Sequence, residues 1–329
     1  METAGIVGLG LAYEAAHQRS LAVPRPPTGV LRAAGTTRLD LIQRLSTNEL
    51  SGIGENEVRP TILTTAIGRI VDRLAVLARG DELWLITSPG RDRIVLDWLQ
   101  RHIFFQDDVQ LSPQLPSLEE WFVVGPEAPE HVRQTLGIPE APAAGHGLAI
   151  PGGLVLGTVS PEPPGVRIVF DSSRTPSGVG AWREGQDEQA ARMAFEAVRI
   201  ESGFPEFGRE FDDGDIPLET GLTYAVSFTK GCYLGQEIIA RMESRARIPR
   251  RLMGAFLEGP HPLPADITSP EGLQGRLTSV AYSPRRGWIG LAVIRSAAAG
   301  ESKGFLSPSE EIRLMDLPFP SHPPEAEAR

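Results

Sequence analysis

Three strand-like segments follow one another between residues 61 and 88, joined by short connections that carry glycine. They are residues 61–67 (TILTTAI), 68–78 (GRIVDRLAVLA) and 82–88 (ELWLITS). The connections lie at Gly68 and at Arg79-Gly80-Asp81. Apolar runs of this length between glycine-bearing connections are typical of neighbouring antiparallel strands. The pattern therefore predicts an antiparallel meander.

Helical spacing alternates with strand-like segments through the first half of the chain. From Thr36 the segment TTRLDLIQRL predicts a helix with a threonine N-cap and one apolar face, made of Leu41, Ile42 and Leu45. A second helix is expected over 91–101, with an apolar stripe of Ile94, Val95, Trp98 and Leu99. Strand-like runs at 121–124, 153–159 and 165–170, with a helical stretch near 129–136, repeat the theme. These elements predict two α+β units.

The pattern changes character after Pro176. The segment 187–203 carries Ala190, Ala194 and Val198 four residues apart, and Gly203 stands where a helix would end. From about residue 248 helical spacing disappears, and four short strand-like segments alternate with turn residues. We expect two α+β units over 1–247 and a closed or nearly closed β-barrel over 248–329. The tail over 319–329 is expected to be disordered.

Composition limits the classes of function. The chain has 329 residues, a formal net charge of −10 and one cysteine, Cys232. A single thiol excludes an intrachain disulfide framework, a Cys-rich zinc site and an iron–sulfur cluster held by this chain alone. The acidic balance argues against a general binder of nucleic acid or of anionic membranes. No apolar run approaches the roughly 20 residues that span a bilayer, and Glu2 stands where a secretory signal would be basic. We expect a cytoplasmic protein.

Two patterns that could suggest other sites are weak. Gly5, Gly8 and Gly10 resemble part of a nucleotide-binding loop, but Tyr13 occupies the place of the last glycine and no strand can precede it. The acidic residues Asp212, Asp213, Asp215 and Glu219 lack the spacing of a calcium loop, so a solvated turn is the better interpretation. No metal site is predicted.

The densest motif surrounds the cysteine. Gly231 and Gly235 bracket Cys232, and residues 236–242 have helical spacing, so the thiol is expected just before a helix N-terminus with Lys230 nearby. A helix N-terminus and an ammonium both favour thiolate over thiol. The flanking glycines favour a functional cysteine that a ligand or partner can approach. A buried, inert cysteine is the alternative.

The same residues resemble a known family. The run Lys230-Gly231-Cys232-Tyr233-Leu234-Gly235-Gln236-Glu237 is similar to the K-G-C-[FY]-x-G-Q-E signature of the folate-binding YgfZ family, relatives of the glycine-cleavage T protein. Residues 199–205 and 216–222 resemble its R-[IL]-E-x-G-x-P and I-P-x-E-x-G-L segments, and residues 43–50 and 68–72 its amino-terminal segments. The resemblance covers roughly residues 28–295. It implies an α+β fold in which two α+β units and a small barrel surround a central cavity that holds a reduced folate.

The resemblance also implies site residues. Glu201 matches the glutamate that binds the pteridine ring, a task suited to a carboxylate because it accepts two parallel hydrogen bonds. Pairing of Glu201 with Arg199 or Arg192 is the alternative. The further residues expected to bind tetrahydrofolate are Lys230, Tyr233, Gln236 and Arg241.

Asp72 and Cys232 are the candidate catalytic residues. In the related aminomethyltransferases the strand equivalent to residues 70–74 carries two adjacent acids, whereas this chain has Asp72 followed by Arg73. That departure disfavours aminomethyl transfer while leaving a folate contact open. An exposed Asp72 paired with Arg73 or Arg69 is the alternative.

Two hypotheses for function follow. In the favoured one, the protein binds tetrahydrofolate and uses Cys232 to support assembly or repair of iron–sulfur clusters on client enzymes, including those that thiolate tRNA. In the other, it is a folate-dependent aminomethyltransferase or another one-carbon transferase with Asp72 as the orienting acid. Basic residues after the loop, Arg241, Arg245, Arg247, Arg250 and Arg251, either attract the carboxylates of a folate polyglutamate tail or form a solvated face. Direct binding of nucleic acid is not expected, because no aromatic stacking platform accompanies them.

Overall fold

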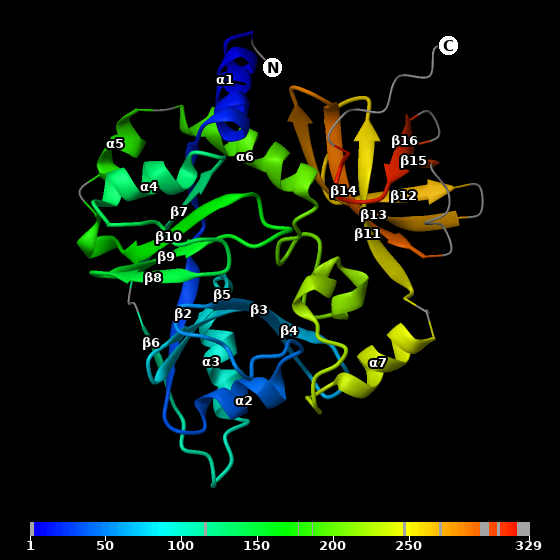
Figure 1. Cartoon of the computed structure of the whole chain (residues 1–329). Helices are drawn as coiled ribbons and strands as arrows, with labels where there is room; N and C mark the ends of the chain where they lie inside the picture. Colours follow the sequence, from blue (N-terminus) through cyan, green and yellow to red (C-terminus); the bar gives the residue numbers. More distant parts are fainter. Residues whose placement is uncertain are drawn as a thin grey trace.

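Two antiparallel sheets and a closed barrel make up the molecule (Figure 1). The computed structural model describes residues 3–114, 117–176, 178–185, 187–245, 248–269, 272–296, 303–307 and 310–320. The expected α+β architecture, with two sheet-and-helix units followed by a barrel, is confirmed. The division of the chain at residues 247 and 248 stays a prediction. The tail was expected to be disordered from Phe319, but Phe319 is buried and packs on Phe256; residues 321–329 lie outside the described residues.

The first sheet contains the predicted meander. Its strand order is β3-β4-β5-β2-β6, and neighbours run antiparallel, with Arg79 opposite Glu82 at the β4–β5 turn. The elements are β2 (Thr28–Ala34), α2 (Arg38–Leu45), β3 (Val58–Thr64), β4 (Ile70–Arg79), β5 (Glu82–Pro89), α3 (Asp92–Gln100) and β6 (Gln110–Pro113). Leu41, Val95 and Leu99 anchor the two helices in one core with the sheet. Strands β2 and β6 were not predicted.

Two local predictions in this unit were wrong. Thr37 precedes α2, but its side chain makes no capping hydrogen bond to the helix, because its hydroxyl accepts instead from the backbone N–H of Asp108. Ile94 is 45% exposed, whereas Leu96 is buried. The apolar stripe of α3 is therefore rotated toward Leu96 relative to the expected one.

The second sheet packs face to face on the first. Its strand order is β1-β7-β10-β9-β8. The elements are β1 (Leu21–Arg25), β7 (Leu118–Val124), α4 (Ala128–Leu136), β8 (Gly147–Ile150), β9 (Gly153–Gly157), β10 (Gly165–Asp171) and α5 (Val179–Glu184). Leu77 and Ile86 of the first sheet share a buried cluster with Leu154 and Val169 of the second. The facing surfaces hold the two units together, since apolar area is removed from water on both sides.

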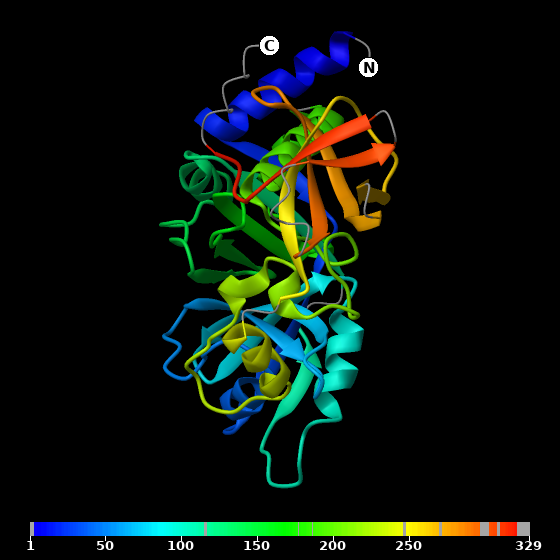
Figure 2. The same cartoon turned by 90° about the vertical axis from the view of Figure 1, so that its right-hand side faces the viewer.

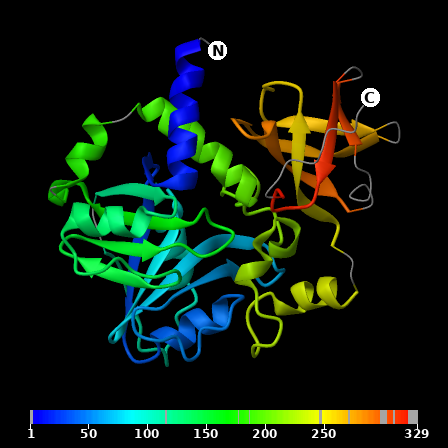
Figure 3. The ribbon, with the colours of Figure 1, turned by 45° about the horizontal axis from the view of Figure 1, so that its top comes forward.

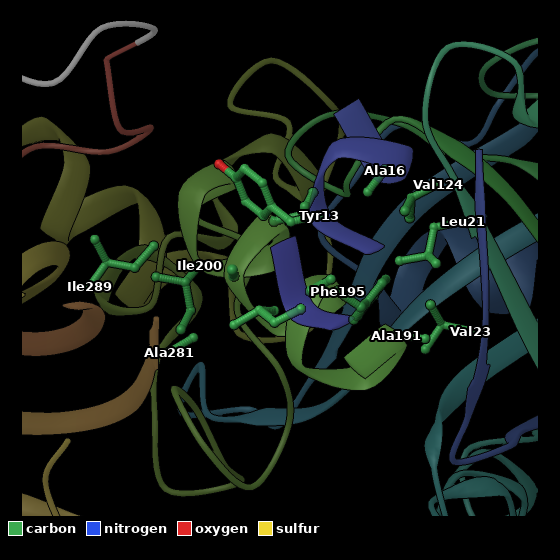
Figure 4. Close-up of a cluster of buried hydrophobic side chains, with 14 of the residues drawn as sticks. Tyr13, Ala16, Leu21, Val23, Val124, Ala191, Phe195, Ile200, Ala281 and Ile289 are labelled. Carbon is green, nitrogen blue, oxygen red and sulfur yellow. The ribbon is translucent and has the colours of Figure 1, made fainter. Parts of the chain in front are cut away.

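Helix α6 (Glu188–Ser202) lies between the second sheet and the barrel and is almost continuously buried on one side. The Asp187 side chain caps it by accepting from the Ala190 N–H, and Gly203 ends it with a φ of 70°. Helix α1 (Thr3–Gln18), which was not predicted, packs along α6. Phe195 of α6 meets the second sheet, whereas the Tyr13 ring of α1 points away from that sheet (Figure 4).

The barrel follows a connecting segment that covers the first sheet. That segment contains two short 3₁₀ turns and α7 (Gln236–Ser244), and packs Leu222 and Tyr233 against Ile62 and Ile70. The barrel closes in the order β11-β14-β13-β12-β15-β16. Its strands are β11 (Arg250–Leu257), β12 (Ala265–Ser269), β13 (Gly272–Ser283), β14 (Gly287–Arg295), β15 (Lys303–Ser307) and β16 (Glu310–Met315).

Closure of the barrel is confirmed, although six strands replace the four expected. The turned views show the barrel beside α6 and α1, away from α2 and α3 (Figures 2 and 3). Among the helices of the described residues, none is both long and apolar enough to cross a membrane.

Candidate functional site

A cavity of about 250 Å³ lies where the two sheets meet α6 and the segment after it. Four phenylalanines form much of its wall, namely Phe122, Phe195, Phe204 and Phe207. Aromatic faces of this kind stack on a planar ring and exclude water from it. The cavity is slightly smaller than the roughly 300–1,000 Å³ usual for ligand pockets, so it suits a compact ring system.

Arg73 is the charged residue that strand β4 presents to this cavity. Its Nη1 lies 3.0 Å from Glu162 Oε1 and donates to the Tyr224 hydroxyl at 3.3 Å. The guanidinium carbon lies 4.7 Å from the centre of the Phe204 ring. Arg73 Nε is buried and has no hydrogen-bond partner among the described residues. This guanidinium therefore has one donor that no described residue uses.

Glu206 is the most accessible carboxylate of the cavity. Its side chain is 22% exposed and pairs with Arg25 and, at 3.2 Å, with Arg209. Glu120, in contrast, is buried and committed, because it accepts from the Thr28 N–H at 2.9 Å and from Arg167. Glu162, the third carboxylate of the lining, is 12% exposed and pairs with Arg73 and Arg167, so Glu206 is the best placed to exchange part of its bonding for a ligand's N–H groups.

The predicted catalytic Asp72 lies behind the cavity wall. Successive residues of a strand point to opposite faces, so Arg73 turns toward the cavity and Asp72 toward the start of α3. Asp72 is fully buried, and its Oδ2 accepts from the Ser88 N–H at 2.9 Å. Burial raises the pKa of Asp72, although the Ser88 hydrogen bond opposes the rise. The alternative of an exposed Asp72 paired with Arg73 or Arg69 is wrong.

Glu201, the predicted pteridine ligand, is held at the junction of α1, α6 and the barrel. It accepts from the Tyr13 hydroxyl at 2.7 Å and from the Ser283 hydroxyl at 2.6 Å, and His17 and Arg286 lie within 3.5 Å. Burial alone would raise its pKa, but hydrogen bonds from His17, Ser283 and Tyr13 lower the pKa of Glu201. The carboxylate is not among the residues that line the cavity.

Neither expected alternative partner pairs with Glu201. Arg199 is bound to Glu196 and Glu210, and Arg192 is bound to Glu188. The folate role of Glu201 stays a prediction, and its carboxylate would have to leave four internal partners to take part.

The predicted Cys232 loop lies on the surface, and the thiol is exposed. The alternative of a buried cysteine is therefore wrong. The Lys230 ammonium is not available to the thiol, because it donates to the backbone oxygens of Gln43, Ser46 and Asn48 at 2.7–2.8 Å. Burial lowers the pKa of Lys230 to about 8, against the attraction of Glu49. Lys230 thus fastens the loop to the end of α2.

Gly235 has a structural reason to be glycine. Its φ is 84°, and a Cβ there would lie 2.5 Å from the Thr65 oxygen and 3.0 Å from the Gly68 Cα. The loop is thereby pressed against the β3–β4 turn. Around Gly231, a Cβ would meet nothing within 4 Å. The backbone on the Gly231 side of the thiol is therefore open to approach by a partner.

The remaining predicted folate ligands lie near the loop and not at the cavity. Tyr233 is 8% exposed and packs on Ile62 and Ile70, and burial raises its pKa to about 12. Gln236 begins α7, and Arg241 is exposed on the same helix. Their role in folate binding stays a prediction.

The acidic residues of the segment 212–219 form ion pairs with one of the arginines that follow the Cys232 loop. Arg250 binds Asp215 at 2.8 Å and Glu219 at 2.7 Å, so these acids form ion pairs and not only a solvated turn. Arg251 pairs with Asp316, whereas Arg247 lies outside the described residues. Within the described part of the chain, no three His, Cys, Asp or Glu side chains are grouped as metal ligands would be.

The cavity residues that sequence reasoning missed differ in how well they could be found. Phe204 lies within the 199–205 segment that resembles the family, and Glu206 follows it directly, so this motif could have indicated both residues. Glu162 lies in the proline-rich turn before β10 and reaches Arg73 only because the two sheets pack together. Nothing local in the sequence indicates that pairing.

Comparison of the fold identifies its class. The structure superimposes on the crystal structure of the glycine cleavage system aminomethyltransferase T from Bartonella henselae with a TM-score of 0.81, covering 96% of this chain and 91% of that one at 16% identity. The chain therefore has the T-protein-like fold that the resemblance implied. No family model matches the sequence.

Comparison of the sequence finds relatives named as transferases and a relative named as an iron–sulfur cluster assembly factor. A putative chloroplastic transferase of Arabidopsis thaliana is 27% identical over 91% of this chain and 71% of its own length. An aminomethyltransferase of Rubrobacter xylanophilus is 26% identical, covering 95% and 84%. The mitochondrial iron–sulfur cluster assembly factor IBA57 of Mus musculus is 37% identical, but only over 31% of this chain and 30% of its own. The chain is thus similar both to aminomethyltransferases and to a cluster assembly factor.

Proposed function

We propose that this protein binds a reduced folate in the central cavity and supports the assembly or repair of iron–sulfur clusters on client enzymes, including enzymes that thiolate tRNA. The observation that carries the proposal is the pairing of a phenylalanine-walled cavity with an exposed cysteine in a separate, rigidly fastened loop. Similarity to aminomethyltransferases and to an iron–sulfur assembly factor supports each half. Cytoplasmic thiol buffers would keep Cys232 reduced, which fits our expected location.

The cavity suits the pteridine part of tetrahydrofolate. Its phenylalanines can stack on the ring, while Glu206 can accept hydrogen bonds from the ring's amino and N–H groups. Arg73 keeps an unpaired buried donor that suits a ring carbonyl. The cavity holds the ring system only, so the rest of a bound folate would lie outside it.

Cys232 would act on the cluster, which is cargo here and not a resident group. As thiolate it would replace one external ligand of a cluster iron, and its proton would pass to solvent. The other iron ligands would come from the client or an assembly protein, because this chain has a single cysteine. Cys232 is not among the cavity-lining residues, so the folate has no direct chemical role in this step.

Complementation tests the thiol. In a strain that lacks the gene, we expect low activity of iron–sulfur enzymes, restored by the wild-type chain and not by Cys232→Ala. Thr229→Ala, at an exposed position beside the same loop, is the matched control and should complement. Full rescue by Cys232→Ala would defeat the thiol mechanism.

Calorimetric titration with tetrahydrofolate tests the cavity. We expect Phe204→Ala to weaken binding by about tenfold or more, since stacking and buried area are both lost. Glu206→Gln and Glu201→Ala separate the two candidate carboxylates. Weakening by Glu206→Gln alone places the ring in the cavity, whereas weakening by Glu201→Ala alone would support the resemblance-based assignment.

A one-carbon transferase is the second candidate. The relatives named aminomethyltransferase favour it. Arg73 disfavours it, because the cavity-facing residue of β4 is a cation paired with Glu162 and cannot orient an amine as a carboxylate would. Release of a one-carbon unit from an aminomethyl donor to tetrahydrofolate by the purified protein would decide for this candidate.

A further inference from the structure

A second hollow, larger than the cavity, runs along the outside of the barrel. We call it the barrel groove; its volume is about 570 Å³, and it lies between strands β12 to β14 and the segment 208–215. Its arginines are Arg209, Arg250, Arg276 and Arg295.

Strand register brings three of these arginines together. Arg250 of β11 lies directly opposite Arg295 of β14, and Arg276 of β13 lies opposite Val293, two residues from Arg295. Opposed residues on neighbouring strands are about 5 Å apart and diagonal ones about 7–8 Å apart, so these cations share one small area. Like charges in that arrangement repel unless anions neutralise them.

The groove also contains four acids, Glu210, Asp212, Asp215 and Asp266, which equal the arginines in number but do not contact all of them. Asp215 binds Arg250, and Glu210 is fully occupied by Arg199, Thr278 and Ser279. Arg276 has only a marginal contact with Asp266 at 3.9 Å, and both side chains are more than half exposed. Arg295 is exposed and has no hydrogen bond or ion pair with any residue in the described part of the chain. The guanidinium groups of Arg276 and Arg295 are thus free to bind an anion, whereas Asp215 and Glu210 are already bound.

The groove adjoins the central cavity. Arg209 lines both spaces, and its two terminal nitrogens are held by Glu196 at 2.6 Å and Glu206 at 3.2 Å. A ligand whose ring fills the cavity and whose remainder passes Arg209 would lay that remainder against Arg276 and Arg295.

We propose that the barrel groove binds a chain of carboxylates attached to the cavity ligand, with Arg276 and Arg295 as its principal contacts. This inference rests on the proposed folate function, for which the chain is the γ-linked glutamate tail. Of the five arginines that the sequence suggested for the tail, only Arg250 lines the groove, so the inference moves the tail to the outer face of the barrel. Planar guanidinium groups match carboxylates in geometry as well as charge.

Affinities of tetrahydrofolate carrying one or five γ-linked glutamates test the proposal. We expect the five-glutamate form to bind the wild-type protein about tenfold more tightly at low ionic strength, and the gain to shrink as salt screens the charges. Arg276→Gln/Arg295→Gln should abolish the gain and leave affinity for the one-glutamate form unchanged. The matched control, Arg93→Gln/Arg192→Gln, removes two exposed charges from α3 and α6 and should keep the gain.

A gain that persists in Arg276→Gln/Arg295→Gln, or no gain in the wild type, would overturn the groove assignment and leave the folate function standing. If no form of tetrahydrofolate binds, the proposed function fails, and free penta-γ-glutamate then tests the groove alone. Binding of that peptide to the wild type but not to Arg276→Gln/Arg295→Gln supports the groove; absence of binding, or equal binding, overturns it.

Discussion

Arg199 and Arg73 both hold carboxylates in the interior of this molecule, and they differ in how many of their N–H donors are used. Arg199, between α6 and the barrel, uses all five N–H donors on Glu196, Glu210, Ser279 and the Phe204 oxygen. Arg73, at the cavity, makes hydrogen bonds through Nη1 alone and leaves Nε without a partner among the described residues. A saturated arginine fixes structure, whereas one with spare donors can also meet a ligand.

The largest expected effect comes from opening the saturated cluster. Arg199→Met should lower the free energy of unfolding by about 3–5 kcal/mol, because it leaves the fully buried Glu210 without its cation. Urea denaturation measures the loss. Arg192→Met is the matched control on the same helix, and its exposed pair with Glu188 should contribute less than about 0.5 kcal/mol. A loss under about 1 kcal/mol for Arg199→Met would remove the distinction between the clusters.

Acid should loosen the same cluster within a defined pH window. Burial would raise the pKa of Glu196, but Arg199 and Arg209 lower it from 4.5 to about 2. Because the folded pKa is the lower one, the stabilisation is complete above pH 4.5 and is lost as pH falls toward 2. The shift corresponds to about 3 kcal/mol.

Urea midpoints measured across this window should fall steeply for the wild type and less steeply for Glu196→Gln, which has no proton to gain. Glu188→Gln, at the exposed start of α6, is the control and should keep the wild-type slope. Parallel curves for the wild type and Glu196→Gln would contradict the assigned pKa.

The secondary structure could be predicted from the sequence only where the local signals were strong. Helix α6 and its end at Gly203 were predictable, because apolar spacing and a C-terminal glycine are local signals. Helix α1 was missed although Leu9, Tyr13 and Ala16 have helical spacing, since its glycines suggested a loop. The fold followed from the resemblance, whereas strands β12 and β15 gave no alternation strong enough to be predicted.

The site residues also divide into those that a local motif indicates and those whose position depends on the three-dimensional packing. The exposed loop at Cys232 was predictable from a dense local motif. Assigning Asp72 and Glu201 to the cavity depended on which way each side chain points, and the structure turns Asp72 toward α3 and Glu201 toward α1. Arg73 and Glu162, which do meet at the cavity, come from different sheets, and their contact depends on packing between sheets.

The smallest expected loss comes from Arg73→Met. Glu162 would keep a cation, because Arg167 Nη1 lies 3.6 Å from the same carboxylate oxygen, and only the Tyr224 hydroxyl would lose an Arg73 donor besides. We therefore expect a loss of about 1–2 kcal/mol in urea denaturation, clearly below that of Arg199→Met. Affinity for tetrahydrofolate should fall in Arg73→Met and stay unchanged in Arg192→Met. If Arg73→Met instead costs as much stability as Arg199→Met and leaves folate affinity unchanged, then the cavity arginine is as structural as the buried one.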